Sequence, residues 1–354
     1  MVTPSTTVEL HVPPSTEEQL EDLLSTPSRA LVENLSRLPG DIVILGAGGK
    51  MGPSLAKLAR RATDLADGGR HHRRVIAVSR FTSSGLPEEL HAFGVETVSC
   101  DLLDPAAVAK LPDALNVVFM AGRKFGSTGG EALTWAMNAY VPALVAERYR
   151  NARLAIFSSG NVYPFVPIGS GGATEAMTPN PIGEYAQSVL GRERIFEHFA
   201  RQYGASVVTI RLNYAVDLRY GVLLDVAQQV KSGQPVDVTM GHANVIWQGD
   251  ANAISLRALT IADNPPTILN LTGPETVSIR WLAHEFGQRF GVEPIIEGRE
   301  ADTALLNNAS RCHARFGYPL VSLLQMVDWT THWVNIGGPT LNKPTHFQER
   351  SGKF

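Results

Sequence analysis

The chain has 354 residues, of which 44% are hydrophobic and 18% are charged, the balance of an ordinary globular protein. Its formal net charge of −3 excludes the strong basic field of many nucleic-acid-binding proteins, so we expect no nucleic-acid partner. Residues 1–24 are polar and acidic, unlike a signal peptide, and no apolar run reaches the roughly 18 residues that a membrane span needs. We therefore expect a cytoplasmic protein without a membrane partner.

Residues 1–40 are predicted to form an N-terminal helical arm in front of the first strand. Ser15, followed three residues later by Glu18, predicts a capped helix start, and the leucines that follow give this helix an apolar face. A second short helix is expected over residues 28–38. We expect the arm to pack on the main body or on a partner subunit.

From residue 41 onward, short apolar strands alternate with helical segments. Six strands are expected at residues 41–45, 74–79, 95–100, 116–121, 152–159 and 205–212. They are rich in Val and Ile, which is typical of strands that are covered on both faces. Residues 41–212 are therefore predicted to form an α/β fold, a doubly wound parallel sheet of the Rossmann type.

After the sixth strand the regular alternation ends. Helices are expected near residues 222–232, 251–261 and 280–290, and connections rich in Pro and Gly separate them. Residues 213–335 are predicted to form a smaller substrate-binding cap over the carboxyl ends of the strands, interleaved with the Rossmann domain. Residues 336–354 show no periodicity and are predicted to be an irregular tail.

The segment ILGAGGKMGPSL follows the first strand and opens a helix. Gly46, Gly49 and Gly52 have the spacing of a dinucleotide-binding turn, in which glycines allow a tight turn, close approach of a pyrophosphate and close helix packing. Lys50 and Met51 complete the turn and are predicted to contact the cofactor. Because the turn joins a first strand to a first helix, we favour a dinucleotide site over a merely structural turn.

The tip of the second strand predicts the cofactor preference. An acidic residue there would accept the ribose hydroxyls of NAD, but this chain has Ser79 and Arg80. A hydroxyl and a guanidinium suit a 2′-phosphate, which a carboxylate would repel. We therefore favour NADP over NAD, with Lys50 as a second candidate cation. The alternative is that Arg80 is an ordinary solvated arginine.

Several motifs then occur in the order of one known family. In chain order these motifs are GAGGKMG, CDLLD, FMAGRKFG, WAMNAYVPAL, FSSGNVYPF, GEYAQSVL and RLNYAV. On these motifs the chain resembles, over residues 41–335, an extended short-chain dehydrogenase/reductase of the NAD(P)-dependent epimerase/dehydratase family. It implies additional cofactor contacts at Asp101, Leu102, Ala121 and Gly122.

The resemblance also implies the chemistry. A nicotinamide exchanges hydride with a carbinol carbon, Tyr185 exchanges the hydroxyl proton, and Ser159 holds the same oxygen. Tyr185 is expected to contact the cofactor as well. Asn138 matches the family's mid-helix asparagine, and we predict it to be one of the catalytic residues. Asn213 matches an asparagine that faces the substrate in the family.

The chain departs from the family at Val189, where the family has a lysine that lowers the pKa of the tyrosine and binds the nicotinamide ribose. A free tyrosine has a pKa near 10, so it needs nearby positive charge to act as a base. A different cation could supply that charge, and we favour Lys124, which would also contact the cofactor. Arg192 is the alternative cation, if its side chain folds back along the helix. Two further alternatives are that the positive nicotinamide ring is sufficient by itself, and that the protein binds cofactor and catalyses little.

A second departure concerns the substrate. Relatives that act on nucleotide-diphosphate sugars usually carry an arginine shortly before the aspartate matched by Asp250, and this chain has none there. Arg219 and Lys231 are the only cations between residues 214 and 248. We therefore expect a small sugar-like substrate without a nucleotide diphosphate. The side chains expected to line its pocket are Ser159, Asn161, Tyr163, Asn213, Tyr214 and Gln248.

These patterns predict an NADP(H)-dependent oxidoreductase or epimerase that acts on a hydroxyl or carbonyl group. The alternative is a cofactor-binding protein with weak or no catalysis, a sensor or scaffold; the missing lysine favours it, and the retained serine and tyrosine oppose it. Cys100 and Cys312 lack the spacing of zinc ligands, so no metal is expected. Family members often pair through two helices per subunit, here residues 132–148 and 185–202, so a homodimer is expected.

Overall fold

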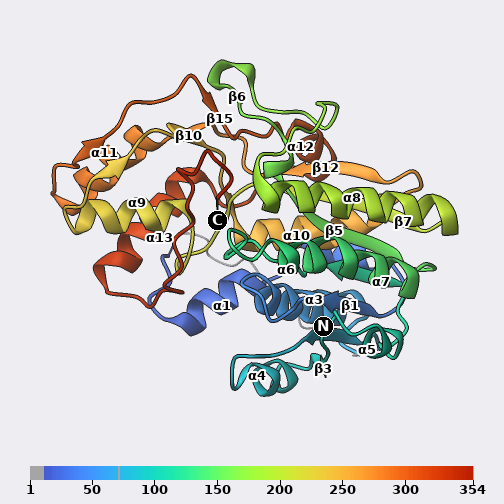
Figure 1. The fold of residues 1–354 in the computed structure, drawn as a ribbon. Helices are drawn as coiled ribbons and strands as arrows, with labels where there is room; N and C mark the ends of the chain where they lie inside the picture. The colour runs from blue at the N-terminus through green and yellow to red at the C-terminus, as the bar shows by residue number, and fades with distance from the viewer. Residues whose placement is uncertain (1–11, 71, 354) are drawn as a thin grey trace.

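A seven-stranded parallel sheet forms the centre of the computed structural model, which describes residues 12–70 and 72–353 (Figure 1). Its strands are β1 (Ile42–Leu45), β2 (Val75–Ser79), β3 (Glu96–Ser99), β4 (Asn116–Phe119), β5 (Arg153–Ser159), β7 (Ser206–Leu212) and β12 (Thr267–Leu271). They lie in the order β3-β2-β1-β4-β5-β7-β12, and each neighbouring pair is parallel. The six predicted strands and the doubly wound α/β fold are therefore confirmed. β12 is an additional edge strand, and it lies within the segment expected to form the cap.

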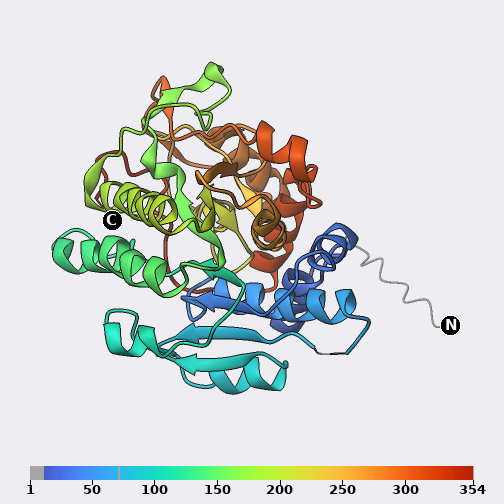
Figure 2. The ribbon, with the colours of Figure 1, turned by 90° about the vertical axis from the view of Figure 1, so that its right-hand side faces the viewer.

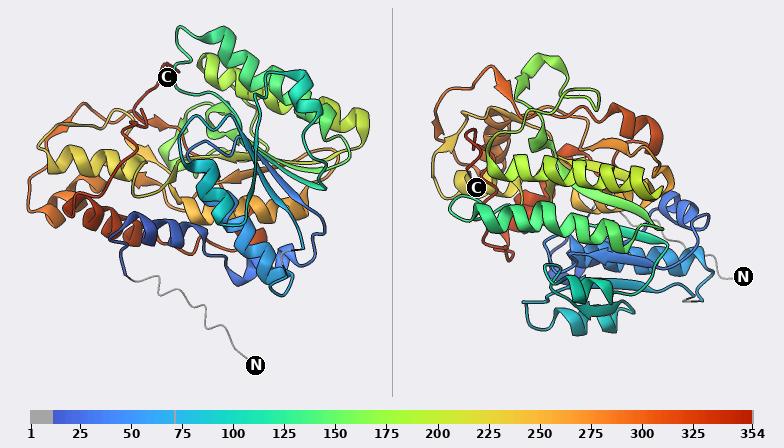
Figure 3. Two further views of the ribbon diagram at one scale, coloured as in Figure 1. Left: turned by 90° about the horizontal axis from the view of Figure 1, so that it is seen from below. Right: turned by 45° about the vertical axis from the view of Figure 1, so that its right-hand side comes forward.

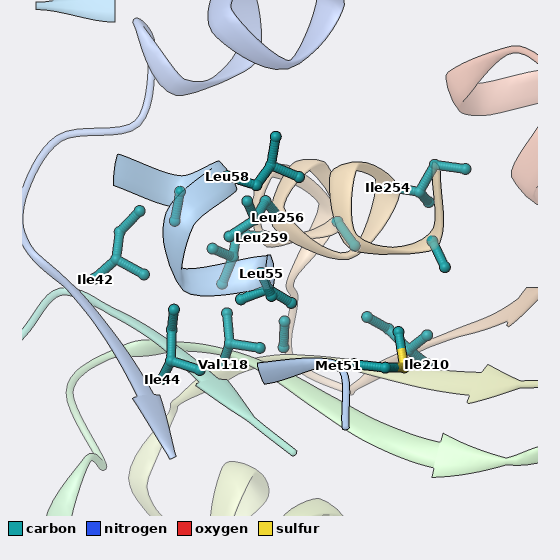
Figure 4. Packing of buried hydrophobic residues seen from close by; sticks show 14 of the residues in the cluster. Ile42, Ile44, Met51, Leu55, Leu58, Val118, Ile210, Ile254, Leu256 and Leu259 are labelled. Atoms are coloured by element: carbon teal, nitrogen blue, oxygen red, sulfur yellow. The ribbon is translucent and has the colours of Figure 1, made fainter. Parts of the chain in front are cut away.

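The strands bury side chains on both faces, which explains their nearly continuous apolar sequences. In β1, Ile42 and Ile44 belong to one hydrophobic core, whereas Val43 and Leu45 belong to a second core on the opposite face. Figure 4 shows part of the first core, where Ile42 and Ile44 lie beneath leucines of two helices. Each face of the sheet therefore needs its own layer of helices.

Helices cover both faces of the sheet (Figure 3). The first core is covered by α2 (Arg29–Leu35), α3 (Gly52–Ala66), α4 (Leu86–Ala92), α10 (Gln248–Ala258) with its 3₁₀ extension (Leu259–Ile261), and α12 (Ser310–Phe316). The second core is covered by α5 (Pro105–Ala109), a π-helical turn η1 (Ala136–Tyr140) that joins α6 (Glu131–Trp135) to α7 (Val141–Arg148), and α8 (Gly183–Tyr203). Within the described ranges, no helix is long and apolar enough to cross a bilayer.

The cap has its own hydrophobic core. Its helices are α9 (Val222–Lys231), α11 (Ile279–Phe290) and α13 (Leu323–Asn335). Its short strands pair as β8 (Ala215–Val216) with β11 (Ile246–Trp247), β9 (Val236–Asp237) with β14 (Ile296–Glu297), and β10 (His242–Ala243) with β13 (Val277–Ser278). Two of the three helices expected after the sixth strand lie here; the third is α10, which begins three residues early and packs on α3 in the Rossmann layer.

β6 (Val166–Pro167) pairs with β15 (Thr303–Ala304), and two short 3₁₀ turns (Gly160–Val162 and Ile168–Ser170) flank β6.

The arm packs on the main body and contacts both cores (Figure 2). The leucines of α1 (Glu17–Ser25) enter the cap core, and those of α2 enter the first core of the sheet. The predicted capping pair is shifted by one residue. Thr16 Oγ1 accepts a hydrogen bond from the backbone N–H of Gln19 at 3.2 Å, and Gln19 Oε1 accepts one from the N–H of Ser15 at 2.7 Å. The helix is thus capped by Thr16 with Gln19, rather than by Ser15 with Glu18.

The tail after α13 has no helix or strand up to Lys353, as its lack of periodicity predicts. It nevertheless runs from the cap to the start of α8, and in Figure 1 it is the red segment that ends near the centre. Thr345 N and Oγ1 both donate to Asp225 Oδ2 in α9, at 2.9 and 2.6 Å. Gly352 lies directly against Gly183, the first residue of α8. The tail therefore ties the cap to the helix that carries Tyr185.

Candidate active site

The glycine turn lies where the strand order reverses, between β1 and β4, which is the usual ligand position in this fold. Gly46 has a φ of +91°, and a Cβ there would lie 2.5 Å from the backbone nitrogen of Ala121. A Cβ on Gly52 would overlap the carbonyl group of Ala47. Side chains at these positions would push the turn away from β4 or distort the start of α3. The close approach explains the glycines and leaves backbone N–H groups at the amino end of α3 for an anion.

A cavity of about 230 Å³ opens beside this turn. It is lined by Gly46, Gly48, Gly49, Ser79, Arg80, Thr82, Cys100, Asp101, Leu102, Met120, Ala121, Gly122 and Met137. Most of the predicted cofactor-binding residues therefore meet at one place, although they come from the ends of four different strands. Arg80 is exposed, whereas Asp101 uses one carboxylate oxygen to accept the N–H of Leu103 at 3.0 Å. The lining, which combines glycines with Ser79, Arg80 and Asp101, suits the adenosine and phosphate part of a dinucleotide.

Lys50 and Met51 belong to the same turn but do not line this cavity. The Met51 side chain is buried in the first core, so that only its backbone can face a ligand (Figure 4). Lys50 extends toward the cap, with Nζ 3.3 Å from the centre of the Tyr220 ring. The side chain is solvent-accessible, but surrounding protein atoms desolvate its ammonium group and lower the pKa of Lys50 to about 7, which nearby Asp217 partly opposes. Lys50 therefore lies between the Rossmann sheet and the cap.

Ser159 and Tyr185 are brought together as predicted. Ser159 is the last residue of β5, Tyr185 lies in the first turn of α8, and their side chains are hydrogen-bonded to each other. Ser159 Oγ also accepts hydrogen bonds from the backbone and side-chain nitrogens of Asn161, both at 3.2 Å. Burial raises the pKa of Tyr185, while the Ser159 hydrogen bond and the charge of Arg192 act in the opposite direction. The pair is arranged for proton exchange, provided that positive charge stabilises the tyrosinate.

Asn138 lies in the π-helical turn and is completely buried. Its Oδ1 accepts from Arg123 N at 2.9 Å and from Arg192 Nη2 at 2.8 Å. Its Nδ2 donates to Arg123 O at 2.9 Å and to Ser188 Oγ at 3.0 Å. All of its hydrogen-bonding capacity is used inside the protein, so Asn138 acts by fixing the loop after β4 to α8 rather than by touching substrate.

Two cations lie near Tyr185. Lys124 Nζ is 6.0 Å from the centre of the Tyr185 ring and 3.5 Å from the carbonyl oxygen of Thr345. Burial lowers the pKa of Lys124 to about 8. Arg192 does fold inward, and its guanidinium is buried behind Gly122. Val189 is 1% exposed and packs in an apolar cluster, so it contributes no charge.

Three of the predicted substrate contacts have structural roles instead. The Tyr163 hydroxyl is buried, donates to Asn270 Oδ1 and accepts from Arg211 Nη1, both at 2.8 Å. Asn213 is buried and donates to the carbonyl of Leu305 at 3.2 Å. The buried amide of Gln248 donates to Ser54 Oγ at 3.1 Å, between α10 and α3. In each case the polar group points into the protein because a buried donor or hydroxyl must find a partner there.

Asn161 and Tyr214 remain beside the Ser159–Tyr185 pair. Asn161 is half-buried and bonded to Ser159, as described above. Tyr214 has a φ of +38°, and its phenol lies close enough to interact electrostatically with Tyr185. The left-handed backbone is unusual for a bulky side chain and is typical of functional sites. These two residues are the best-placed substrate contacts among those predicted.

The tail residues next to Lys124 were not among the predicted site residues. Thr345 contacts Lys124, and the His346 ring lies 6.1 Å from the ring of Phe125 in the same loop. A tail without periodicity gives no sign in the sequence of where it packs, whereas the site residues within motifs do. The C-terminal tail therefore forms one side of the site, next to Lys124.

Comparisons with known proteins agree with this geometry. A family model described as the NAD dependent epimerase/dehydratase family matches residues 42–247, more than half of the chain. No curated protein matches the sequence significantly.

Solved structures with the same fold share little sequence with this chain. UDP-glucose 4-epimerase from Thermotoga maritima with UDP-glucose is 18% identical, with a TM-score of 0.67 over 83% of this chain and 98% of its own. UDP-glucose 4-epimerase from Thermus thermophilus in complex with NAD is 19% identical, with a TM-score of 0.66 over 82% and 97%. UDP-glucuronic acid 4-epimerase from Bacillus cereus with UDP-glucuronic acid and NAD is 17% identical, with a TM-score of 0.69 over 83% and 99%. The chain therefore belongs to the NAD dependent epimerase/dehydratase family, NAD(P)-dependent enzymes of the extended short-chain dehydrogenase/reductase type.

Proposed function

We propose that the protein is an NADP(H)-dependent oxidoreductase or epimerase that acts on a hydroxyl or carbonyl group of a small sugar-like substrate. One observation carries this proposal: the hydroxyls of Ser159 and Tyr185 are hydrogen-bonded to each other at the carboxyl edge of the sheet. The glycine turn lies at the same edge, after β1. A serine–tyrosine pair next to a dinucleotide cradle is suited to moving a proton while hydride moves to or from the cofactor.

The chain's own residues handle the proton. The Ser159 hydroxyl holds the substrate oxygen, and the Tyr185 oxygen takes its proton when a carbinol is oxidised or returns it when a carbonyl is reduced. A nicotinamide, when bound, supplies or accepts the hydride. Asn138 keeps the loop after β4 in register with α8, and Asn161 orients Ser159. A dehydrogenase would release an altered cofactor, whereas an epimerase would regenerate it.

NADP is the proposed cofactor because of Ser79 and Arg80. Both line the cavity at the tip of β2, where NAD-preferring members of this fold place a carboxylate. Arg80 forms no ion pair within 4.0 Å in the described residues, so its guanidinium is available to a 2′-phosphate. NADPH should therefore raise the melting temperature more than NADH at equal concentration. The reverse order would contradict this assignment.

The substrate is proposed to lack a nucleotide diphosphate, unlike the UDP-sugars in the Thermotoga and Bacillus structures. Arg219 pairs with Glu21 at 2.7 Å and with Asp217 at 3.1 Å. Lys231 donates to Asn335 Oδ1 at 2.9 Å, away from the Ser159–Tyr185 pair. Both cations of the segment 214–248 are therefore engaged elsewhere, which supports a substrate recognised by neutral hydrogen bonds.

A homodimer is also proposed, through α6–α7 and α8. Leu133, Trp135 and Tyr140 are 43%, 38% and 48% exposed on the segment that leads into α7. Exposed apolar side chains on a helical segment favour association. Light scattering should therefore give twice the chain mass, and Leu133→Glu should lower it to a single chain. A monomeric unmodified protein would contradict this part of the proposal.

The decisive experiment combines a substrate panel with a matched set of variants. Sugar acids, lactones and free sugars are offered with NADP⁺ or NADPH, and both cofactor absorbance and product stereochemistry are followed. Tyr185→Phe should lower turnover by about 10²–10⁴-fold. Ser159→Ala should cost about ten- to hundredfold, because one hydrogen bond to a developing charge is lost. Tyr318→Phe, at an exposed surface tyrosine, is the control and should have no effect.

A cofactor-binding protein without catalysis is the second candidate, and Val189 is the observation that favours it. In that case NADPH would stabilise the protein, yet no panel member would be turned over. Turnover that survived in Tyr185→Phe would instead contradict the site itself. The two results distinguish a missing activity from a wrong assignment of residues.

A further inference from the structure

Arg192 is a buried cation whose hydrogen bonds go to neutral groups. It is 5% exposed, Nη1 donates to the Phe157 carbonyl at 2.7 Å, and Nη2 donates to Asn138 Oδ1 at 2.8 Å. Its Nε has no hydrogen-bond partner among the described residues. The neighbouring Glu193 pairs with Arg211 instead, and no carboxylate within 4.0 Å pairs with Arg192 in the part of the chain that the structure describes. Burying a charge without a counter-ion is costly, so the position of Arg192 indicates a specific role.

The guanidinium lies directly behind the wall of the cofactor cavity. Its Cζ is 5.2 Å from the centre of the Phe119 ring in β4. A Cβ on Gly122 would overlap Nη2 and would lie 3.0 Å from Asn138 Oδ1. Gly122 itself lines the cavity on its other side. Only a residue without a side chain fits between the guanidinium and the cavity, so this contact is specific to the glycine.

Arg192 lies two turns after Tyr185 in α8, and hydrogen bonds connect the two through Asn138. Asn138 accepts from Arg192 Nη2 and donates to Ser188 Oγ, which in turn donates to the Tyr185 carbonyl. The side chains of Arg192 and Tyr185 interact electrostatically, and each favours the charged form of the other. We infer that Arg192 provides the fixed positive charge that stabilises the tyrosinate of Tyr185 during proton transfer, taking the role that Val189 cannot fill. The inference deepens the proposed function and rests on it.

Other charged or titratable groups also face Tyr185. Lys124 comes from the loop after β4, and Tyr214 and Tyr220 come from the segment that leads into the cap. The tyrosines are neutral at physiological pH and add no positive charge. Burial lowers the pKa of Lys124 to about 8 and that of Arg192 only to about 10. Both groups are charged at neutral pH, but as the pH rises Arg192 keeps its charge beyond the point where Lys124 loses its own.

A titration of Tyr185 tests the inference without requiring turnover. The tyrosinate absorbance of each protein, minus that of its Tyr185→Phe counterpart, reports the ionisation of this side chain. Arg192→Gln keeps hydrogen-bond donors but removes the charge, and it should raise the apparent pKa of Tyr185 by about 1–2 units. Where turnover is found, the acid limb of the pH–rate profile for oxidation should move by the same amount. Arg194→Gln, at an exposed arginine on the same helix, is the matched control and should move neither.

Two further variants keep the test decisive if Arg192→Gln does not fold. Arg192→Lys retains the charge and should leave the Tyr185 titration close to that of the unmodified protein, whereas Lys124→Gln should leave it unchanged. A folded Arg192→Gln with an unchanged Tyr185 titration would overturn the inference, as would a shift of a full unit in Lys124→Gln. Absence of turnover, with the Arg192→Gln shift present, would count against the proposed function but not against this assignment of charge.

Discussion

Replacing Arg211 by methionine should be one of the most destabilising single changes outside the Ser159–Tyr185 pair. Arg211 in β7 is buried and forms a two-pronged ion pair with Glu193 in α8, with Nε–Oε1 at 2.9 Å and Nη2–Oε2 at 2.7 Å. Methionine fills much of the volume but leaves the buried carboxylate of Glu193 without its cation. The free energy of unfolding should therefore fall by about 3–5 kcal/mol.

A double-mutant cycle measures whether the pair itself causes that loss. Glu193→Leu combined with Arg211→Met should recover most of the stability, because a buried ion pair replaced by apolar groups is often neutral. Urea unfolding of the four proteins, followed by tryptophan fluorescence, gives the coupling free energy. Arg201→Met removes an exposed pair with Glu197 on the same helix and should cost less than about 1 kcal/mol. Additive losses in the cycle, or an Arg211→Met loss no larger than this control, would refute the reasoning.

Four further outcomes are expected. Arg80→Glu should weaken NADPH binding at least about tenfold and spare NADH, because the carboxylate repels a 2′-phosphate; thermal-shift titrations with both cofactors measure this. Gly52→Ala should abolish NADPH binding by forcing its Cβ into a neighbouring carbonyl, whereas Gly169→Ala, which meets open space, should not. Thr345→Ala removes the hydrogen bond that the Thr345 hydroxyl donates to Asp225 in α9 but keeps the one from its backbone N–H, and it should destabilise the tail by about 1–3 kcal/mol, detectable as faster proteolysis. Burial raises the pKa of Asp250 from 3.8 to about 6, so the folded protein binds this proton more tightly than the unfolded chain. The contribution of Asp250 to stability should therefore be greatest below pH 4 and fall by up to about 3 kcal/mol as pH rises through 6; urea unfolding should show that Asp250→Asn removes this dependence.

The sheet and the glycine turn could be predicted from the sequence because each is encoded locally. A short apolar run or a glycine spacing can be recognised within about ten residues. For that reason the six strands could be predicted correctly. β12 has a similar apolar run, but a long cap segment separates it from β7, and nothing local shows that the chain returns to the sheet. Gly352 and Thr345 illustrate the same limit, since their partners are more than 100 residues away.

Side-chain direction was harder to predict than position. Tyr163 stands in a motif beside Ser159, yet its hydroxyl turns inward because Arg211 and Asn270 are buried there and need partners. Arg192 is a second example: its charge predicts a solvent-exposed side chain, but the side chain is buried. Both outcomes depend on hydrogen bonds between buried polar side chains of different helices and strands. A single sequence does not show which of these side chains are in contact.

The geometry of α8 explains how a cation can reach Tyr185 from position 192 rather than 189. Tyr185, Ser188 and Arg192 lie along one face of the helix, and the latter two both bond to Asn138. Val189 lies one turn after Tyr185 and packs in an apolar cluster that the Tyr185 side chain also contacts. A lysine at 189 would have to place its ammonium in or around that cluster. Arg192 starts about 10 Å further along the axis than Tyr185, but helix side chains lean toward the amino end, and a long arginine recovers much of that distance. Position 189 is thereby free to close an apolar core, while the charge behind Tyr185 comes from a residue two turns away.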